Sequence, residues 1–389
     1  MLQVPPADHA VDLICFSHLR WNFVFQRPQH LMTRCARERR VFFFEEPQIS
    51  AAGAPRLEVE KSGGVTVAVP QLPDSLGYDG RIAAQRMLLD EMCATYRIAE
   101  YVAWYYTPMA LAFSDHLDPV ATVYDCMDEL SAFKGAPSVI KDREAELLRR
   151  ADLVLTGGQS LYEAKRHQHP NIHPFPSSVD AAHFAQARRI ATDPLDQADI
   201  PHPRLGFFGV IDERMDLALL DGIAAARPDW HLVLLGPVAK IDPVSLPQRT
   251  NIHYLGSKQY DELPHYVAGW DVALLPFARN EATRFISPTK TPEYMAAGKP
   301  VVSTSIRDVV RPYGQQGLVR IADDVPSFVR ASVAAMAEDA TKRITLADAF
   351  LRQTSWDGTW SRIRLLVDDA IRDNVAEGDA DIADNASAV

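Results

Sequence analysis

The chain has 389 residues, of which 47% are hydrophobic and 23% charged, an ordinary balance for a soluble globular protein. This length exceeds what one ordinary core organises, so we expect two domains. The formal charge of −11 argues against general nucleic-acid binding, because such proteins usually carry a basic surface. We therefore expect no nucleic-acid partner.

The cysteines and the apolar runs indicate a cellular compartment. The four cysteines lie far apart and form no C-x-x-C pair, which favours buried thiols in a reducing compartment over disulfides or a zinc site. Residues 1–10 contain no long apolar segment, and no uninterrupted run of about 18 apolar residues occurs. We predict a cytoplasmic protein without signal peptide or membrane-spanning helix.

Short apolar runs alternate with helical stretches through the first half of the chain. We predict strands at 11–16, 41–44, 65–69, 101–105, 120–124 and 153–156, and helices at 27–39, 81–96 and 139–150. Nearly all-apolar strands separated by helices indicate a parallel sheet that helices cover on both faces. The first half is therefore predicted to be a doubly wound α/β domain.

A second cycle follows a linker at 180–203 that is rich in proline, alanine and aspartate. We predict strands at 204–210, 230–235, 251–255, 270–275 and 300–303, with helices at 215–226 and 260–269. Gly209, Gly236 and Gly256 end three of these strands, which places open loops where such sheets bind ligands. Two such domains would hold their site in the cleft between them.

The end of the chain is predicted to be helical at 329–337, 341–352 and 356–373. We assign 1–185 to the first domain and 186–355 to the second. Residues 356–376 form a C-terminal helix that is expected to pack back on the first domain. Residues 377–389 are small, acidic and free of aromatics, which is typical of a disordered tail.

The most informative segment is 286–302, which reads as a loop, a short helix, a glycine stop and a buried strand. Pro292 near the helix start and Gly298 at its end follow the usual asymmetry of helix termini. The helix N-terminus offers free N–H groups to an anion, and Lys290 adds positive charge beside them. Glu293 has two oxygens that can accept bonds from vicinal sugar hydroxyls, unless it is simply a solvated helix carboxylate. The segment predicts a grip on the phosphate and ribose of a nucleotide-activated substrate.

Four segments in order, 21–30 (WNFVFQRPQH), 124–129 (YDCMDE), 176–184 (PSSVDAAHF) and 286–302, resemble the GT-B glycosyltransferases. They are similar to the bacterial group 1 type, which includes enzymes of teichuronic acid biosynthesis. The resemblance implies an α/β GT-B fold, with two Rossmann-like doubly wound domains facing a central cleft. It also implies an enzyme of the hexosyltransferase kind that moves a sugar from a nucleotide-sugar donor, a UDP-sugar, to a hydroxyl. The acceptor would be a cell-surface glycan or a lipid-linked molecule bound by the first domain, and no metal or other cofactor would be needed.

For the donor, the resemblance implies that Glu293 holds the ribose and that Lys290 and Arg214 face the diphosphate. Such fixed cations stabilise the negative charge on the leaving nucleotide more in the transition state than in the ground state. For Arg214 the alternative is a surface arginine paired with Asp212 or Glu213.

Many retaining relatives carry a second glutamate eight residues before the ribose ligand, and this chain has Phe285 there. The contact to the donor sugar and the stereochemical outcome are therefore left open. Neutral hydrogen-bonding candidates nearby are Asn280, Thr283, Ser287 and Thr289.

The first domain offers candidate catalytic and acceptor residues. Asp125 and Asp128 follow a buried strand and are candidates for the general base, with Asp128 ahead, or for capping the next helix. His18 and Arg20, in the loop after the first strand, and Arg27, at the start of the next helix, are predicted to face the acceptor or the diphosphate. A structural role is the alternative for each of them.

The arginine-rich run at 34–40 lies near a helix end, where cations complement the helix dipole. The second interpretation is attraction to anionic lipid head groups, which predicts peripheral contact with the cytoplasmic face of the inner membrane. Two rival functions remain: a UDP-sugar epimerase of the same fold and a non-catalytic nucleotide-sugar-binding protein. An NAD dehydrogenase is disfavoured, since no G-x-G-x-x-G follows the first strand.

Overall fold

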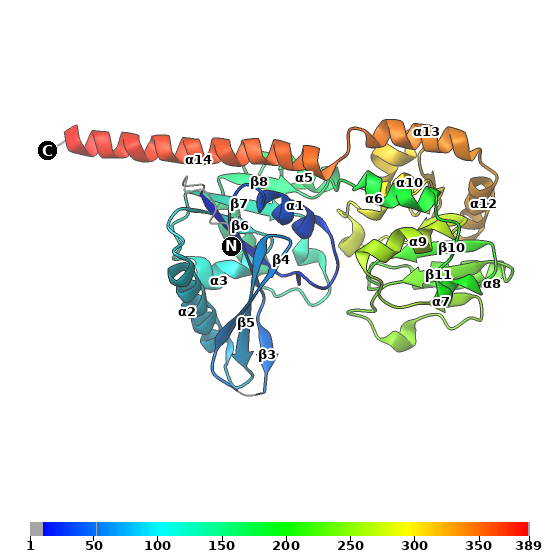
Figure 1. Ribbon diagram of the computed structural model, residues 1–389, viewed down its shortest axis with the longest axis horizontal. Coiled ribbons are helices and arrows are strands. Elements are labelled where there is room, and N and C mark those ends of the chain that lie inside the picture. Colours follow the sequence, from blue (N-terminus) through cyan, green and yellow to red (C-terminus); the bar gives the residue numbers. More distant parts are fainter. Residues whose placement is uncertain (1–10, 52, 388–389) are drawn as a thin grey trace, which may run out of the picture.

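The protein consists of two α/β domains that lie side by side, with one long helix running from the second domain back across the first (Figure 1). The computed structural model describes residues 11–51 and 53–387, with side chains up to residue 376. The predicted lack of a signal peptide concerns residues 1–10, which lie outside this part.

The first domain is built on a sheet whose strand order is β3-β5-β2-β1-β6-β7-β8-β9, with β4 paired to β5. The strands are β1 (Asp12–Ser17), β2 (Val41–Glu45), β3 (Gln48–Ser50), β4 (Arg56–Ser62), β5 (Val65–Pro73), β6 (Tyr101–Tyr105), β7 (Ala121–Cys126), β8 (Leu153–Thr156) and β9 (Ile172–Pro174). All pairings are parallel except that of β4 with β5. The chain order reverses between β1 and β6, which makes this the switch point of the sheet.

Helices cover both faces of the first sheet, which explains its almost entirely apolar strands. These are α1 (Arg27–Cys35), α2 (Tyr78–Tyr96), α3 (Leu111–Ser114), α4 (Ile140–Arg150) and α5 (Gln159–Lys165). Along β1, Leu13 and Cys15 belong to the core under α1, whereas Ile14 and Phe16 belong to the core under α2, α3 and α4. Burial of alternate residues on opposite faces confirms the predicted covered sheet.

The second domain has a sheet in the order β12-β11-β10-β13-β14-β15, parallel throughout. Its strands are β10 (Arg204–Phe208), β11 (His231–Leu235), β12 (Ile252–Tyr254), β13 (Val272–Leu275), β14 (Val301–Ser303) and β15 (Arg320–Ile321). Its helices are α6 (Ala181–Ala185), α7 (Leu195–Ala198), α8 (Leu217–Ala226), α9 (Leu263–Ala268), α10 (Lys290–Ala296), α11 (Arg307–Val309), α12 (Val325–Met336) and α13 (Ala340–Leu351). Here the chain order reverses between β10 and β13, so the switch point lies beside Gly209.

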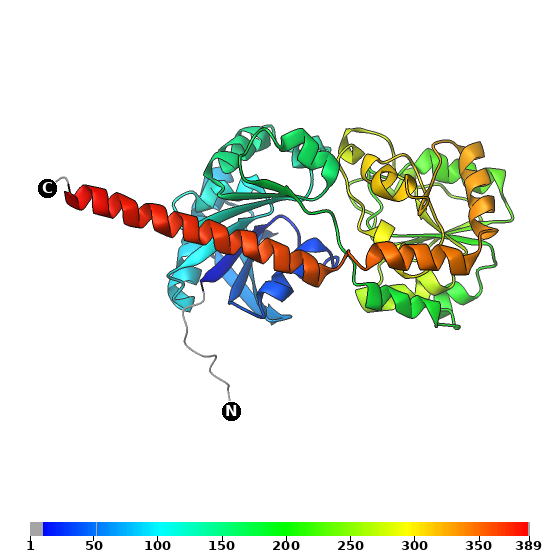
Figure 2. The same cartoon turned by 90° about the horizontal axis from the view of Figure 1, so that it is seen from above.

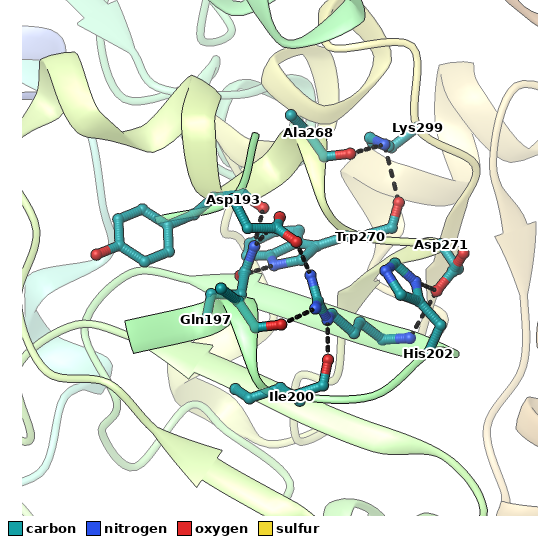
Figure 3. A network of polar contacts seen from close by, with 11 residues as sticks. Asp193, Gln197, Ile200, His202, Ala268, Trp270, Asp271 and Lys299 are labelled. Atoms are coloured by element: carbon teal, nitrogen blue, oxygen red, sulfur yellow. Dashed lines mark hydrogen bonds and ion pairs between the residues drawn. The ribbon is translucent and has the colours of Figure 1, made fainter. Parts of the chain in front are cut away.

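The linker expected at 180–203 is folded onto the second domain. Val179 and Phe184 are fully buried in the second core, so this core begins before residue 186. At the amino ends of β10 and β13, Arg204 donates to a carboxylate oxygen of Asp193 and to the carbonyl of Ile200, both at 2.6 Å. Lys299 donates to the carbonyl of Trp270 at 2.8 Å within the same network (Figure 3). These polar contacts fix the linker at the sheet edge opposite to the strand-end glycines.

The long helix α14 (Trp356–Ser387) lies along the first domain in both views (Figures 1 and 2). Its buried residues Trp356, Trp360, Ile363 and Val367 join the core beneath α1. The helix continues to Ser387, where we predicted a disordered tail from 377; residues 388–389 lie outside the described part. A helix that packing has already nucleated propagates at little cost, which accounts for the difference. No helix between residues 11 and 387, residue 52 aside, is long and apolar enough to cross a membrane.

The chain crosses between the domains twice, and the two crossings lie together. Val179 and Ser355 form a parallel β-bridge, and the hydroxyls of Ser178 and Thr359 are 2.7 Å apart. The linker after β9 and the start of α14 therefore form one paired hinge.

The packing of α14 yields a matched pair of variants. Ile363 is fully buried, while Leu365 on the same helix is 58% exposed. We expect Ile363→Ala to lower the free energy of unfolding by about 2–5 kcal/mol, because it removes buried methyl groups and leaves a cavity. Leu365→Ala should change it by less than about 0.5 kcal/mol. Urea titration followed by tryptophan fluorescence measures both; equal losses would contradict the docking of α14.

Candidate functional site

A cavity of about 750 Å³ opens between the carboxyl edges of the two sheets. Its second-domain wall includes Phe208, Gly209, Leu235, Gly236, Pro237, Tyr260, Thr289, Lys290 and Glu293. Its first-domain wall includes Trp21, Asn22, Phe23, Phe25, His30 and Arg34. The cavity therefore lies where the strand-end glycines predicted a ligand site.

Two glycines keep the floor of this cavity open. Gly209 has φ +140°, and a Cβ there would lie 2.2 Å from Cε of Lys290. Gly236 has φ +135°, and a Cβ there would lie 1.9 Å from the carbonyl oxygen of Gly209. A larger residue is excluded at both positions, so bare backbone and one lysine meet at the end of β10.

Lys290 and Glu293 lie on the first turn of α10 and both line the cavity. Burial lowers the pKa of the Lys290 ammonium, and the charge of Glu293 opposes this shift. Burial raises the pKa of Glu293 to about 7, which the charge of Lys290 opposes. A half-buried lysine and a buried carboxylate thus sit one helical turn apart.

The polar atoms of Glu293 and Tyr260 are incompletely bonded. Glu293 is 7% exposed, and within the described structure its Oε2 and the hydroxyl of Tyr260 are both buried without a hydrogen-bond partner. Both residues line the cavity. A buried polar atom without a hydrogen-bond partner costs about 1–3 kcal/mol. A ligand with hydroxyl groups would satisfy both.

Tyr260 also links the two domains. Its ring stacks on His183 at 4.2 Å between centroids and lies 4.8 Å from the ring of Phe25 in the first domain. His30 contacts Phe25 at 4.7 Å and stacks on Trp356 at 4.5 Å. Sequence reasoning missed this aromatic cluster, because its members come from four separate segments and carry no common motif.

Asp128 and Arg214 approach each other across the domain boundary. Asp128 is half-buried; burial raises its pKa to about 6, and the charge of Arg214 partly offsets this. Arg214 makes the ion pair with Asp212 that the sequence offered as an alternative, at 2.7 Å between Nη2 and Oδ2. Its guanidinium also lies 5.7 Å from the ring centroid of Phe133. Arg214 thus forms an ion pair with Asp212 and also lies near Asp128.

A further cation, Lys240, was not predicted. It has φ +60°, and its Nζ lies 5.2 Å from the ring centroid of Phe133 in the first domain. Burial, and secondly the charge of Lys240, lower the pKa of His18 to about 4. The same charge acts on Asp128. His18, Asp128 and Lys240 therefore converge, although the loop after β11 gave no sequence signal.

Arg27 and Asp125 do not line the cavity, contrary to their predicted roles. They form a buried ion pair, 2.9 Å between Nη2 and Oδ1, with side chains 2% and 0% exposed. Arg27 also donates to the carbonyl of Phe175 at 2.7 Å. Because buried charges need such partners, the pair braces the first domain against the linker and leaves no open carboxylate for an acceptor.

Three other predicted residues serve local structure and lie outside the cavity lining. Arg20 pairs with Glu45 at 3.0 Å, at the edge of the first sheet. Asn280 is exposed, caps a turn and donates to the carbonyl of Glu213 at 3.3 Å. The carbonyl of Ser287 accepts from the first-domain side of the hinge, the hydroxyl of Ser177, at 3.4 Å. Of the neutral candidates, only Thr289 lines the cavity.

Phe285 occupies the position where many relatives carry a second glutamate. It is half-buried and packs against the first-domain core. The side chain at this position therefore supports the contact between the two domains.

The arginine run near the end of α1 pairs with acids. Arg34 and Arg37 bind Asp357 at 2.8 and 3.4 Å, and Arg39 binds Asp368 at 3.2 Å. These ion pairs join α1 to α14 and account for the run without a lipid surface.

All four cysteines are free thiols, three of them buried, as predicted.

A comparison with known protein families finds a match for the second domain. Residues 202–338 match the family described as Glycosyl transferases group 1. The second domain belongs to this family. The matched segment contains the cavity-lining residues Glu293, Lys290 and Tyr260, and also Arg214, whereas the lining residues Asp180 and His183 precede it.

The group 1 assignment agrees with one curated relative. The chain is 27% identical over 236 residues to the putative teichuronic acid biosynthesis glycosyltransferase TuaH of Bacillus subtilis (strain 168). The match covers 56% of this chain and 59% of TuaH, so the chain spans less than two thirds of that relative.

Solved structures show the fold of the whole chain. The α,α-trehalose 6-phosphate synthase of Burkholderia multivorans matches 95% of this chain and 99% of its own, with a TM-score of 0.66 at 14% identity. The sucrose-phosphate synthase of Thermosynechococcus elongatus matches 92% and 99%, with a TM-score of 0.67 at 14% identity. HepE of Anabaena, solved with UDP and glucose, matches 92% and 100%, with a TM-score of 0.64 at 15% identity. The group 1 domain is thus one half of a GT-B fold, as the sequence predicted.

Proposed function

We propose that this protein is a glycosyltransferase that moves a sugar from a UDP-sugar to a hydroxyl of a glycan or lipid-linked acceptor. The observation that carries the proposal is the pair Lys290 and Glu293 at the switch point of a group 1 domain. The pair combines a half-buried cation beside bare glycine backbone with a buried carboxylate whose Oε2 has no partner in the described structure. This combination suits a diphosphate and the vicinal hydroxyls of a ribose.

Different residues of the cavity would hold the diphosphate, the ribose and the base of the donor. The diphosphate would lie beside Gly209 and Lys290, where no Cβ obstructs it. The ribose would meet Glu293 and the hydroxyl of Tyr260. The base would continue toward Leu235 and Pro237, which line the same cavity.

The proposed reaction breaks the bond between the sugar and the diphosphate and forms a bond to the acceptor oxygen. The leaving nucleotide gains negative charge, which Lys290 and Arg214 would stabilise. Asp128 would accept the proton of the acceptor hydroxyl. A pKa of about 6 leaves this carboxylate mostly ionised at neutral pH and still basic enough for the task.

The comparisons support the nucleotide and the reaction class. TuaH is described as a glycosyltransferase, and HepE was solved with UDP and glucose. We extend the proposal to the remaining expectations: catalysis without a metal, work in the cytoplasm, and peripheral contact of the protein with the cytoplasmic face of the inner membrane. No group of three or more metal-ligating side chains occurs in the portion that the structure describes.

A thermal-shift panel of UDP-, GDP- and dTDP-glucose tests the donor. We expect the UDP-sugar to raise the melting temperature most, since a ligand at 100 times its Kd adds about 2.7 kcal/mol of stability. If no nucleotide sugar shifts the melting temperature, the proposal fails. Conversion of UDP-N-acetylglucosamine into another UDP-sugar without an acceptor would favour the epimerase alternative.

A further inference from the structure

A second cavity, of about 320 Å³, lies inside the first domain, away from the donor residues. Its lining residues come from the carboxyl ends of β1 and β2, from the segment after β6, and from the helices α2 and α3, which are labelled in Figure 1. Apolar side chains make most of its wall, among them Phe16, Phe44, Ile82, Ala110 and Phe113. The volume and this lining are typical of a pocket for a small apolar group.

One end of this pocket is polar and lies at the carboxyl edge of the first sheet. Ser17 and Thr107 line the pocket. Ser17 is the last residue of β1, and Thr107 lies two residues after the end of β6. Ser17 precedes His18, which lies within the influence of Lys240. Glu46 also lines the pocket; burial raises its pKa, and the charge of Lys240 lowers it. The polar end of the pocket therefore adjoins His18 in sequence and lies on the same carboxyl edge of the sheet as Asp128, which follows β7.

The outer rim of the pocket exposes apolar surface that the core does not require. Ile49, at the edge strand β3, is 45% exposed, and Tyr78, at the start of α2, is 60% exposed. Both line the pocket together with Ile82. Contiguous apolar residues at a pocket rim are a feature of binding sites. Apolar surface thus continues from the pocket interior to the solvent.

We propose that this pocket binds an apolar group of the acceptor, an alkyl, acyl or aryl chain attached next to the hydroxyl that receives the sugar. The inference rests on the proposed transfer reaction and adds the chemical class of its acceptor. The polar end leaves the hydroxyl-bearing part of such a molecule on the carboxyl edge of the sheet that also carries Asp128, and the apolar part enters the wall of Phe16, Phe44 and Phe113. The donor-side cavity, by contrast, presents charged and hydroxyl groups to its ligand.

A chain-length series tests the pocket directly. The full-length protein is titrated by calorimetry with methyl, butyl, hexyl and octyl β-D-glucopyranoside, each below its critical micelle concentration. Each methylene that enters an apolar pocket tightens binding roughly three- to fourfold. We expect the Kd to fall with chain length until the pocket is full. A Kd that does not depend on chain length overturns the proposal.

Two variants on the same helix locate the binding. Ile82 lines the pocket and is half-buried, while Met87 is 43% exposed and lies outside it. We expect Ile82→Glu to weaken octyl glucoside binding at least tenfold and Met87→Glu to leave it unchanged. Equal affinity in the Ile82→Glu variant and the unaltered protein overturns the proposal, since the detergent would then bind elsewhere.

A second substitution covers the case in which Ile82→Glu fails to fold, as judged by circular dichroism. Ala110→Met fills the pocket from the α3 side, so it should shorten the chain length at which affinity stops rising. An unchanged chain-length profile in this variant overturns the proposal. The UDP-glucose melting shift is measured on every variant. If UDP-glucose does not shift the melting temperature of the unaltered protein, the proposed transfer reaction is contradicted. If the shift is present but the Kd does not depend on chain length, only the pocket proposal is contradicted.

Discussion

The Glu293→Gln variant is expected to bind UDP-glucose roughly 10- to 100-fold more weakly, because it loses charge-assisted hydrogen bonds to the ribose. The same substitution should stabilise the free protein. Glu293 is 7% exposed, its Oε2 has no partner in the described structure, and burial raises its pKa to about 7. Glutamine keeps the shape of the side chain and removes the buried charge. A residue that serves binding rather than folding would then show weaker ligand binding together with higher stability.

The gain in stability of Glu293→Gln over the unaltered protein should increase as the pH rises. A carboxyl group whose folded pKa is about 7 and whose ordinary value is 4.5 binds more protons in the folded state between these values. Its burial therefore costs nothing below about pH 4.5 and costs increasingly as the pH rises to 7, up to about 3 kcal/mol. The melting temperature of Glu293→Gln should exceed that of the unaltered protein at pH 8, and the two should converge near pH 5.

Differential scanning calorimetry at pH 5 and pH 8, with and without UDP-glucose, measures both effects. Glu281→Gln is the matched control, because this carboxylate is 78% exposed on the segment before α10. It should change neither quantity. If UDP-glucose raises the melting temperature of Glu293→Gln as much as that of the unaltered protein, the carboxylate does not bind the nucleotide sugar.

The Asp128→Asn variant is expected to lose transfer activity by roughly 100- to 10,000-fold, the usual contribution of a general base. Donor binding should persist, since Asp128 belongs to the opposite domain from Lys290 and Glu293. Because burial raises the pKa of Asp128 to about 6, the activity of the unaltered protein should fall as the pH drops through 6. Below that pH the carboxyl group is protonated and accepts no proton.

Release of UDP from UDP-glucose in the presence of an alkyl glucoside acceptor, followed from pH 5 to pH 8, provides the rate. Glu91→Gln, an exposed carboxylate on α2, serves as the control and should retain the full pH profile. Full activity in Asp128→Asn would assign the proton to another group, whereas lost donor binding would make Asp128 part of the donor site.

The architecture was largely predictable because both sheets are parallel and covered on both faces. Strands such as 41–45 and 153–156 then consist almost wholly of apolar residues, which is a strong local signal. The strand β4 was missed because its residues are charged and mostly exposed, so its pairing with β5 leaves little trace in the sequence.

The site was predictable only where one segment carries it. Lys290 and Glu293 share a helix turn, so their spacing reveals their common orientation. Arg27 and Asp125 are 98 positions apart, and whether two such charges face a cleft or neutralise each other is decided by tertiary packing. Lys240 and Tyr260 enter the site only because two domains dock, which no local pattern encodes.

The paired hinge and the docking of α14 bear on how the chain is made. The core under α1 needs Trp360, Ile363 and Val367, which follow the whole second domain in the sequence. At about 5–20 residues per second, the ribosome needs roughly 10–40 s to travel from the end of β9 to this helix. During that time one face of the nascent first domain exposes Leu31, Val123 and Leu155 to the surroundings. The first half of the chain is therefore the last part of the protein to become complete, and a chaperone that shields apolar surface during translation would act on this face.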